Sequence, residues 1–440
     1  MATVKPFSGY RFTLKTPGDL GVFCAPPYDM IDDPMIDQLY DKHPNNVVRI
    51  TQNRREPADI ANKDRHVRAS RFFNDWIAQK IITQDDADSI YIYCQQFTVN
   101  QNGISVTHKR IGICLLVKLV DFDRQIVFPH EYTLSGPKQD RYELMETTNA
   151  NTGQIFGLAT DDDAKLYNLI HVIMEKAAPI GTFTDENDVT HTLHRCTEAT
   201  YINQTIELMR TRNILIADGH HRYETALRFY KDRGDEAFSH VMMTLVSMAD
   251  PGLVIRPFHR LVRKSDQGRS VDDMKEALGR YFDVTPLGKT SIQGVVDALA
   301  LPPLAPSSPE IVFWDCSTGE LHGLRLNAAG ENFLAGTMTE RSDNWKRLDV
   351  SKINCVIINS ILELPLDGHV LHDIVNYVND VDAGAKRLTE CADEFYGGFF
   401  IRPLSIGVIN DTVKGGERMP QKSTNFFPKL YSGLVFNKMR

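Results

Sequence analysis

The spacing of hydrophobic residues predicts a strand, a tight turn and a helix over residues 213–234. Residues 213–217 are mostly apolar, as in a buried strand. From Gly219 onward the apolar positions recur at the helical spacing i, i+3, i+4 and i+7, in the order Tyr223, Ala226, Leu227, Tyr230. Asp218 is a favourable N-cap, and Gly234 is a favourable C-terminal stop.

The same reading along the chain predicts a mixed α+β protein of two domains. Strands are expected at 89–99 and 104–120, joined as a hairpin across Asn100–Gly103, with a second hairpin over 181–196. Helices are expected at 61–80, 164–177, 350–363 and 382–393, and further strands at 311–315 and 321–326. We place a boundary near residue 255, which gives an α/β domain over 1–255. A C-terminal α+β domain then spans 256–440, with a tail that could complete the site.

Composition and charge narrow the classes of function. The 440 residues carry a formal net charge of −8, which argues against a protein held to nucleic acid by bulk electrostatics. The first residues contain no apolar signal segment, and no run of apolar residues is long enough to span a membrane. The seven cysteines are scattered without a CxxC pair, so we expect neither a disulfide framework nor a zinc site, and we expect a cytoplasmic protein.

The first turn of the expected helix carries an unusual charge pattern. His220, His221 and Arg222 follow Gly219, although a helix N-terminus is already positive and usually attracts acidic side chains. A bound phosphate would offset their repulsion, because exposed N–H groups at a helix N-terminus also bind anions. The alternative is that the histidines are solvated and that Arg222 pairs with a nearby carboxylate. We expect the turn to bind an anion.

A second polar stretch follows an apolar run. His130 and Glu131 are adjacent, and Lys138 and Arg141 come shortly after them. A carboxylate beside an imidazole can accept a hydroxyl proton, while lysine and arginine can hold a phosphoryl group or a substrate carboxylate. The alternative is a polar loop whose charges are solvated.

Two further stretches could contribute to a site. In the tail, Lys422, Ser423 and Thr424 offer donors of the kind that bind phosphate, although no Walker-type glycine-rich loop is present. The alternative is a segment that only packs its aromatic residues on the core. Near the N-terminus, a pocket rim could be formed by Tyr28, Asp29, Asn46 and Arg49. The alternative is that Asp29 caps the following helix and that Arg49 neutralises a buried acid.

Particular motifs carry a family resemblance. The stretch "ADGHHRYETA" resembles the phosphate-binding turn of the ParB/sulfiredoxin-like superfamily, and its Asp-Gly-His-x-Arg form is most similar to the free-serine kinases. Over its whole length the chain resembles the family called domain of unknown function 1015. The blocks that carry this likeness are "PPYDMI", "NNVVRI", "FPHEYT", "ADGHHRYETAL", "FHRLV" and "MPQKSTNFFPKLYSGLV". One departure is Phe258, where the family usually has a threonine.

The resemblance implies a ParB/sulfiredoxin-like nucleotide-binding core and a phosphotransferase acting on the hydroxyl of a small metabolite, with a free amino acid such as serine as the nearest analogue. It implies ATP or ADP and Mg²⁺ as cofactors. The phosphates would be held by Gly219, His220, His221, Arg222, Lys138, Arg141, Lys422, Ser423 and Thr424. The residues expected to act in catalysis are Glu131 as the base, Asp218 as a magnesium ligand or second base, His130 and His220.

Two other functions remain open at this point. One is a nucleotide-binding regulatory protein of the ParB type, and the other is a phosphohydrolase with the same anion site. Neither the acceptor nor the oligomeric state follows from the sequence.

Overall fold

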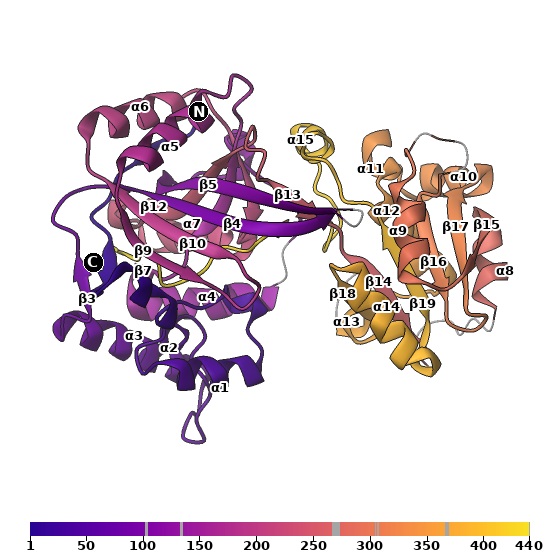
Figure 1. The fold of residues 1–440 in the computed structure, drawn as a ribbon, viewed down its shortest axis with the longest axis horizontal. Helices are drawn as coiled ribbons and strands as arrows, with labels where there is room; N and C mark the ends of the chain where they lie inside the picture. Colours follow the sequence, from indigo (N-terminus) through magenta and orange to yellow (C-terminus); the bar gives the residue numbers. More distant parts are fainter. Residues whose placement is uncertain are drawn as a thin grey trace.

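The computed structural model describes residues 1–101, 104–132, 135–265, 273–303, 305, 308–365 and 369–439. These residues form two lobes that lie side by side (Figure 1). We call them the large lobe, built on a nine-stranded mixed sheet, and the small lobe, built on a six-stranded antiparallel sheet. The C-terminal tail leaves the small lobe and returns to the large one, where the chain ends (Figure 1).

The large sheet contains parallel and antiparallel pairs. Its path runs through β6 (Val127–Pro129), β11 (Ile214–Asp218), β8 (Ile155–Ala159), β12 (His240–Ser247), β5 (Ile104–Lys118), β4 (Ile90–Gln101), β10 (Thr190–Cys196) and β9 (Pro179–Thr184), and β1 (Val4–Lys5) pairs with β5.

Helices cover one face of this sheet. Alternate residues of the strands, such as Ile92 and Ile113, are buried against α5 (Lys165–Lys176), α6 (Ala199–Met209) and α7 (His220–Arg233). The other helices of this lobe are α1 (Asp33–Lys42), α2 (Val48–Thr51), α3 (Asn62–Ala78) and α4 (Ser135–Thr148).

The C-terminal tail covers the opposite face. The residues that alternate with the helix-facing set, such as Tyr93 and Phe156, belong to one buried cluster with Met419, Phe426 and Leu430 of the tail. Because strand side chains alternate between faces, each strand can be buried on both sides only if both layers are present. The tail therefore forms one of the two layers of the large lobe.

The tail also contributes short strands. In it, β20 (Asn425–Phe427) pairs with β13 (Val254–Arg256), and β21 (Asn437–Lys438) pairs with β7 (Ala150–Asn151). A further two-stranded pair joins β2 (Tyr10–Phe12) and β3 (Ile82–Gln84).

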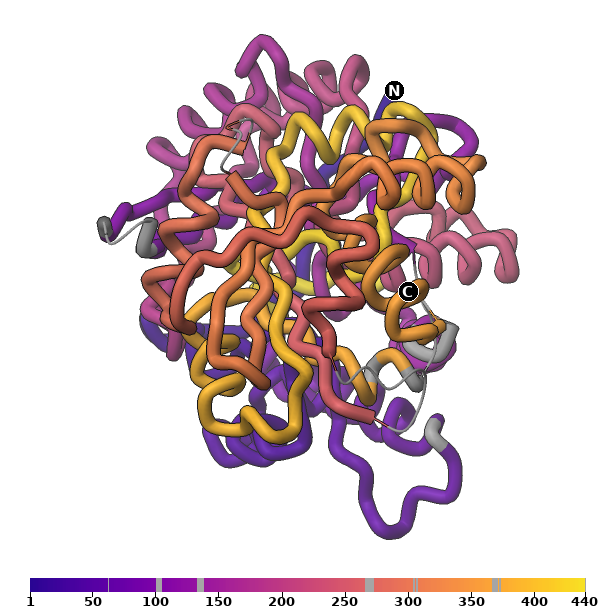
Figure 2. Tube along the Cα trace, turned by 90° about the vertical axis from the view of Figure 1, so that its right-hand side faces the viewer, coloured from indigo at the N-terminus to yellow at the C-terminus, as the bar shows by residue number. Residues whose placement is uncertain are grey.

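The small lobe follows β13 and faces the viewer in Figure 2. Its sheet has the order β15 (Phe282–Lys289), β17 (Glu320–Leu326), β16 (Ile311–Asp315), β19 (Phe395–Ile401), β14 (His259–Arg263), β18 (Val375–Val378). Its helices are α8 (Met274–Gly279), α9 (Ile292–Ala300), α10 (Ala328–Thr337), α11 (Asp343–Arg347), α12 (Asp349–Lys352), α13 (His369–Ile374), α14 (Val381–Glu390) and α15 (Ile406–Lys414).

Most expected elements are present. Both hairpins form, as β4–β5 and β9–β10, although Asn102 and Gly103 of the first turn lie outside the described residues. The helix expected at 350–363 is instead α12 followed by a π-helical segment, Ile353–Ile361. All seven cysteines are free. Among the described residues no helix has both the length and the apolar character to cross a membrane.

The turn between β11 and α7 confirms the strand, turn and helix expected from the sequence. The N-cap of α7 is Gly219 and not Asp218, whose carboxylate pairs with Arg222 and Lys429 instead of capping the helix. Gly219 has φ +91°, in the left-handed region that glycine adopts without steric cost. A Cβ at this position would lie 2.9 Å from Nε of Arg222. The absence of a side chain therefore lets the guanidinium of Arg222 fold back over the turn.

We expect Gly219→Ala to destabilise the protein more than Gly234→Ala. Gly234 ends α7 with φ +63°, and a Cβ there would meet no heavy atom within 4 Å. The control should therefore cost only the left-handed conformation, about 1–2 kcal/mol. Gly219→Ala carries the same cost and must also displace Arg222. Urea unfolding measures the free energy of unfolding of both variants. Equal losses in Gly219→Ala and Gly234→Ala would contradict this account.

Candidate functional site

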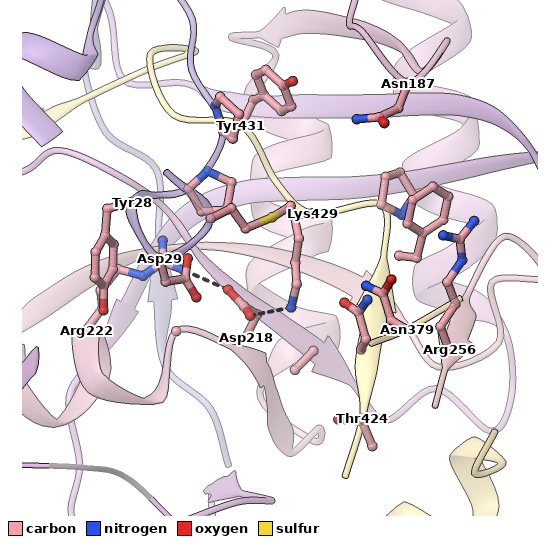
Figure 3. Close-up of a pocket in the computed structure, with 18 of the residues that line it drawn as sticks. Tyr28, Asp29, Asn187, Asp218, Arg222, Arg256, Asn379, Thr424, Lys429 and Tyr431 are labelled. Carbon is pink, nitrogen blue, oxygen red and sulfur yellow. Dashed lines mark hydrogen bonds and ion pairs between the residues drawn. The ribbon is translucent and has the colours of Figure 1, made fainter. Parts of the chain in front are cut away.

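A cavity of about 1060 Å³ lies where β6 and β11 end and α7 begins. The N-terminal segment around Tyr28, the tail, the turn between β9 and β10, and residues of the small lobe such as Asn379 also line it. Figure 3 shows Asp218 and Lys429 near the middle of this wall, with Tyr28 and Asp29 on one side and Arg256 and Asn379 on the other. The cavity is large enough for a nucleotide together with a small second substrate.

The two polar stretches found in the sequence meet at this cavity. Strands β6 and β11 are parallel neighbours, with Pro129 opposite Ile216, which confirms that both belong to one sheet. As a result His130 and His220 follow adjacent strand ends. Their ring centroids are 4.6 Å apart, and the backbone N–H of His130 donates to Nε2 of His220 at 3.3 Å.

His130 is buried and linked to the tail. Its Nδ1 lies 2.6 Å from the carbonyl oxygen of Ile216, which can only accept, so Nδ1 carries a proton. Its Nε2 lies 2.7 Å from Oγ1 of Thr424 and 3.3 Å from Oε1 of Glu131. The imidazole therefore joins the end of β11 to both the candidate base and the tail.

Glu131 is held through one of its two oxygens. Oε1 accepts the backbone N–H of Ser423 and of Thr424, each at 3.0 Å. Burial alone would raise the pKa of Glu131, but His130, His220 and the N–H of Thr424 lower this pKa to about 2. Glu131 lines the cavity, and Oε2 accepts no hydrogen bond from the described residues. The carboxylate is thus ionised and fixed, with one oxygen available to a ligand.

Asp218 sits between two cations. Its Oδ1 accepts from Nζ of Lys429 at 2.6 Å, and its Oδ2 accepts from Nη2 of Arg222 at 2.9 Å. Burial would raise the pKa of Asp218, but Lys429 and Arg222 hold it well below its ordinary value. Arg222 also donates through Nη1 to the carbonyl oxygen of Gln154. This arrangement fixes both cations at the start of α7.

The structure corrects the expectation that an anion is needed to offset repulsion at this turn. Burial, followed by His130, lowers the pKa of His220 to about 3, and burial also lowers the pKa of His221. Both imidazoles are therefore neutral near pH 7. Arg222 pairs with Asp218, as in the alternative interpretation of the sequence. The protein itself relieves the repulsion, and the case for an anion must rest on other features.

The cavity brings together some of the expected residues and excludes others. It is lined by His130, Glu131, Asp218, Gly219, His220, His221, Arg222, Lys422 and Thr424, and by Tyr28 and Asp29 of the N-terminal segment. Ser423 contributes its backbone N–H to Glu131, and its hydroxyl donates to the carbonyl oxygen of Pro420.

Lys138 and Arg141 do not line the cavity. Lys138 forms an ion pair with Glu224, and Arg141 pairs with Asp140 and donates to the carbonyl oxygen of Thr51. Asn46 and Arg49 likewise bond to backbone carbonyls away from it. These side chains stabilise the lobe around the site.

Asp218 does not fit the expected magnesium site, because both of its oxygens are engaged by cations. Within the described ranges no group of three or more His, Cys, Asp and Glu side chains is arranged to hold a metal ion. Any Mg²⁺ at this site would therefore depend on ligands that a nucleotide supplies.

The sequence reasoning missed Lys429 and Arg256. Lys429 follows Phe427 and Pro428 and precedes Leu430, so it is an isolated charge in an apolar run. Such a residue is seldom buried without a partner, and this pattern was the available signal. Arg256 had no comparable signal, because its place in the cavity depends on the pairing of β13 with β20.

The lowered pKa of His220 predicts a pH dependence of stability. In the unfolded chain a histidine has a pKa of about 6.5 and binds a proton below it, whereas folded His220 stays neutral down to about pH 3. This group therefore costs stability as the pH falls from about 6.5 towards 3. We expect His220→Gln, whose amide oxygen can still accept from His130, to lose less unfolding free energy between pH 7 and pH 4 than the unchanged protein. Parallel pH profiles in urea titrations would contradict this.

Structural comparison finds neighbours at low identity. A free serine kinase in complex with AMP matches at 10% identity and a TM-score of 0.34, over 71% of this chain and 86% of that one. SbnI from Staphylococcus aureus, truncated at its C-terminus, matches at 14% identity and a TM-score of 0.35, over 73% and 87%. A conserved hypothetical protein from Pyrococcus furiosus matches at 11% identity and a TM-score of 0.34, over 72% and 93%. These TM-scores are too low to establish a common fold.

No functionally curated protein matches the sequence. A family described as a protein of unknown function (DUF1015) matches residues 4–351. Since this match covers most of the 440 residues, the chain belongs to the DUF1015 family.

Proposed function

We propose that this protein is a nucleotide-dependent phosphotransferase that acts on the hydroxyl group of a small metabolite, and that the large lobe is a ParB/sulfiredoxin-like nucleotide-binding core. The observation that carries the proposal is the placing of Arg222 and Lys429 at the first turn of α7 in the same cavity as Glu131. Phosphoryl transfer requires mainly positioning and charge neutralisation, and these residues are arranged to supply both.

The start of α7 is the proposed phosphate site. Arg222 and Lys429 carry two positive charges against the single negative charge of Asp218, the carboxylate that pairs with both, and this cluster lies beside the positive end of the helix. The first-turn N–H groups of a helix have no partner within it and suit phosphate oxygens. Nε of Arg222 is buried and has no hydrogen-bond partner among the described residues. A phosphate at this position would use donors that the fold leaves open.

Glu131 is the proposed partner of the acceptor hydroxyl. Its Oε2 is open to the cavity, while Oε1 is fixed by the tail. With a pKa of about 2 it is ionised at any ordinary assay pH and can always accept a hydrogen bond from a hydroxyl. In phosphoryl transfer a carboxylate in this role chiefly orients the nucleophile and takes its proton late. The "ADGHHR" resemblance makes a free amino acid such as serine the nearest analogue of the acceptor.

ATP or ADP would supply the phosphoryl group, and the other product would be ADP or AMP respectively. Both oxygens of Asp218 are engaged by cations, so Mg²⁺ would enter with the phosphates of the nucleotide.

The phosphate site is tested by Arg222→Ala. We expect ATP and ADP to bind about 1.5–3 kcal/mol more weakly, the scale of a charge-assisted hydrogen bond. Isothermal titration calorimetry measures the change. Arg228→Ala is the matched control, because Arg228 lies on the same helix with an exposed side chain and does not line the cavity. Unchanged affinity in a folded Arg222→Ala protein would refute the proposed site.

The role of Glu131 is tested by Glu131→Gln. The amide can still accept the N–H groups of Ser423 and Thr424 but carries no charge, so turnover should fall by about 10²–10⁴-fold. ATP affinity should change little, because a carboxylate does not bind phosphate. Turnover is measured as release of ADP from ATP or of AMP from ADP, with a panel of hydroxyl compounds that includes L-serine. Glu417→Gln, outside the cavity, is the control. An equal turnover would assign Glu131 a structural role only.

The same assay separates the other two functions. Release of ADP from ATP, or of AMP from ADP, that is equally fast without any hydroxyl compound would indicate a phosphohydrolase. Nucleotide binding without either release under any condition would indicate a nucleotide-binding regulatory protein.

A further inference from the structure

Arg256 presents an unpaired guanidinium to the cavity. It is the last residue of β13, it lines the cavity, and it makes no hydrogen bond or ion pair with the described residues. A partly buried guanidinium normally satisfies several of its five donors within the protein. These donors therefore remain available for a ligand.

The guanidinium is nevertheless held in place. Its central carbon lies 3.5 Å from the ring centroid of Phe427, a stacking contact that fixes the plane of the group. The backbone of Arg256 pairs with Asn425, and the carbonyl oxygen of Phe427 accepts from Nη1 of buried Arg110 at 2.9 Å. Both the strand that carries Arg256 and the ring beneath it are thus anchored to the large lobe.

The surroundings of Arg256 suit a carboxylate. Asn379 and Asn425 lie beside Arg256 and have neutral amides, and Figure 3 shows Asn379 away from Arg222. A second cation, Lys422, also lines the cavity, and its Nζ lies 5.1 Å from the ring centroid of Phe258. The acidic group that acts electrostatically on Arg256 is Asp380, and its carboxylate is engaged in capping α14 through the N–H of Ala383 at 2.9 Å. A planar guanidinium flanked by neutral amides matches a carboxylate, which it can bind through two parallel hydrogen bonds.

The position relative to Glu131 is also informative. Thr424 donates its N–H to Glu131, and the next residue, Asn425, is the backbone partner of Arg256. Glu131 and Arg256 are therefore anchored to consecutive residues of the tail, and both line the same cavity. This arrangement suits a small molecule that presents a hydroxyl to one residue and an acidic group to the other.

We propose that Arg256 binds the carboxylate of the acceptor substrate, so that the acceptor is a small hydroxy acid with its hydroxyl at Glu131 and its carboxylate on Arg256. This assignment rests on the proposed phosphotransferase for the role of the hydroxyl. The planar guanidinium can bind a carboxylate through two parallel hydrogen bonds, which fixes orientation as well as charge. Arg256 would then determine specificity without contacting the phosphate.

The test uses the protection of Arg256 from phenylglyoxal, a reagent for accessible guanidinium groups. Three probes are compared. Glycolate has a hydroxyl and a carboxylate, and in ethylene glycol a second hydroxymethyl group replaces the carboxylate. Inorganic phosphate is the third probe. Labelling is followed by peptide mass spectrometry, with exposed Arg228 as internal control. We expect glycolate to slow the labelling of Arg256 about tenfold or more, with no effect of ethylene glycol and none on Arg228.

Two results would overturn the inference. Equal labelling of Arg256 with and without glycolate would remove the carboxylate subsite. Protection by inorganic phosphate at least as strong as protection by glycolate would make the subsite a phosphate site instead.

The proposed function is tested separately, by titrating the unmodified protein with ATP and measuring binding. If ATP does not bind but glycolate protects Arg256, the phosphotransferase fails and the carboxylate subsite stands. If ATP binds but glycolate does not protect, only the subsite fails. As a second check, Arg256→Gln should weaken glycolate binding in calorimetry about tenfold or more. Arg256→Lys keeps the charge but not the planar guanidinium, so its affinity for glycolate should lie between that of the unchanged protein and that of Arg256→Gln.

Discussion

The ion pair between Asp218 and Lys429 joins residues 211 positions apart and determines the form of the site. Asp218 ends a buried strand at the foot of α7, where an unpaired carboxylate would be costly. Lys429 can reach it only if the tail lies across the sheet. Once it does, Arg222 on the other side of Asp218 is also fixed, and the cavity acquires its two cations. The site therefore depends on where the C-terminal tail lies.

The tail is held there by more than this pair. Buried Arg110 donates to the carbonyl oxygens of Phe427 and Pro428, and Gln95 donates to that of Lys429 at 2.9 Å. At the other end of the segment, Glu131 accepts two backbone N–H groups. These side chains satisfy polar backbone groups that the irregular tail would otherwise bury without partners, and such groups are expensive to leave unpaired. Polar groups and apolar contacts together thus make the tail a structural layer.

The sequence correctly predicted those features that depend on the local pattern of residues. Apolar spacing and Gly219 gave the strand, turn and helix, and an apolar run was found before each of His130 and His220, whose strands the structure shows to be neighbours. The sequence also suggested that the tail completes the site. It missed particular contacts between distant segments, since nothing near Arg256 indicates that β13 pairs with β20, and the partner of Lys429 could not be identified as Asp218. It also misjudged protonation, because the neutrality of His220 results from burial, which no local pattern displays.

Asp218 has a physical role even though it opposes the binding of an anion. Without it, Arg222 and Lys429 would repel each other in a poorly solvated cavity, and their flexible side chains would turn towards water. The carboxylate holds both cations in fixed positions at the helix terminus while cancelling only one of the two charges. A phosphate that enters finds donors already oriented, so less conformational freedom is lost on binding. Asp218 thus weakens the electrostatic attraction of the site for a phosphate but preorganises the two cations that would bind it.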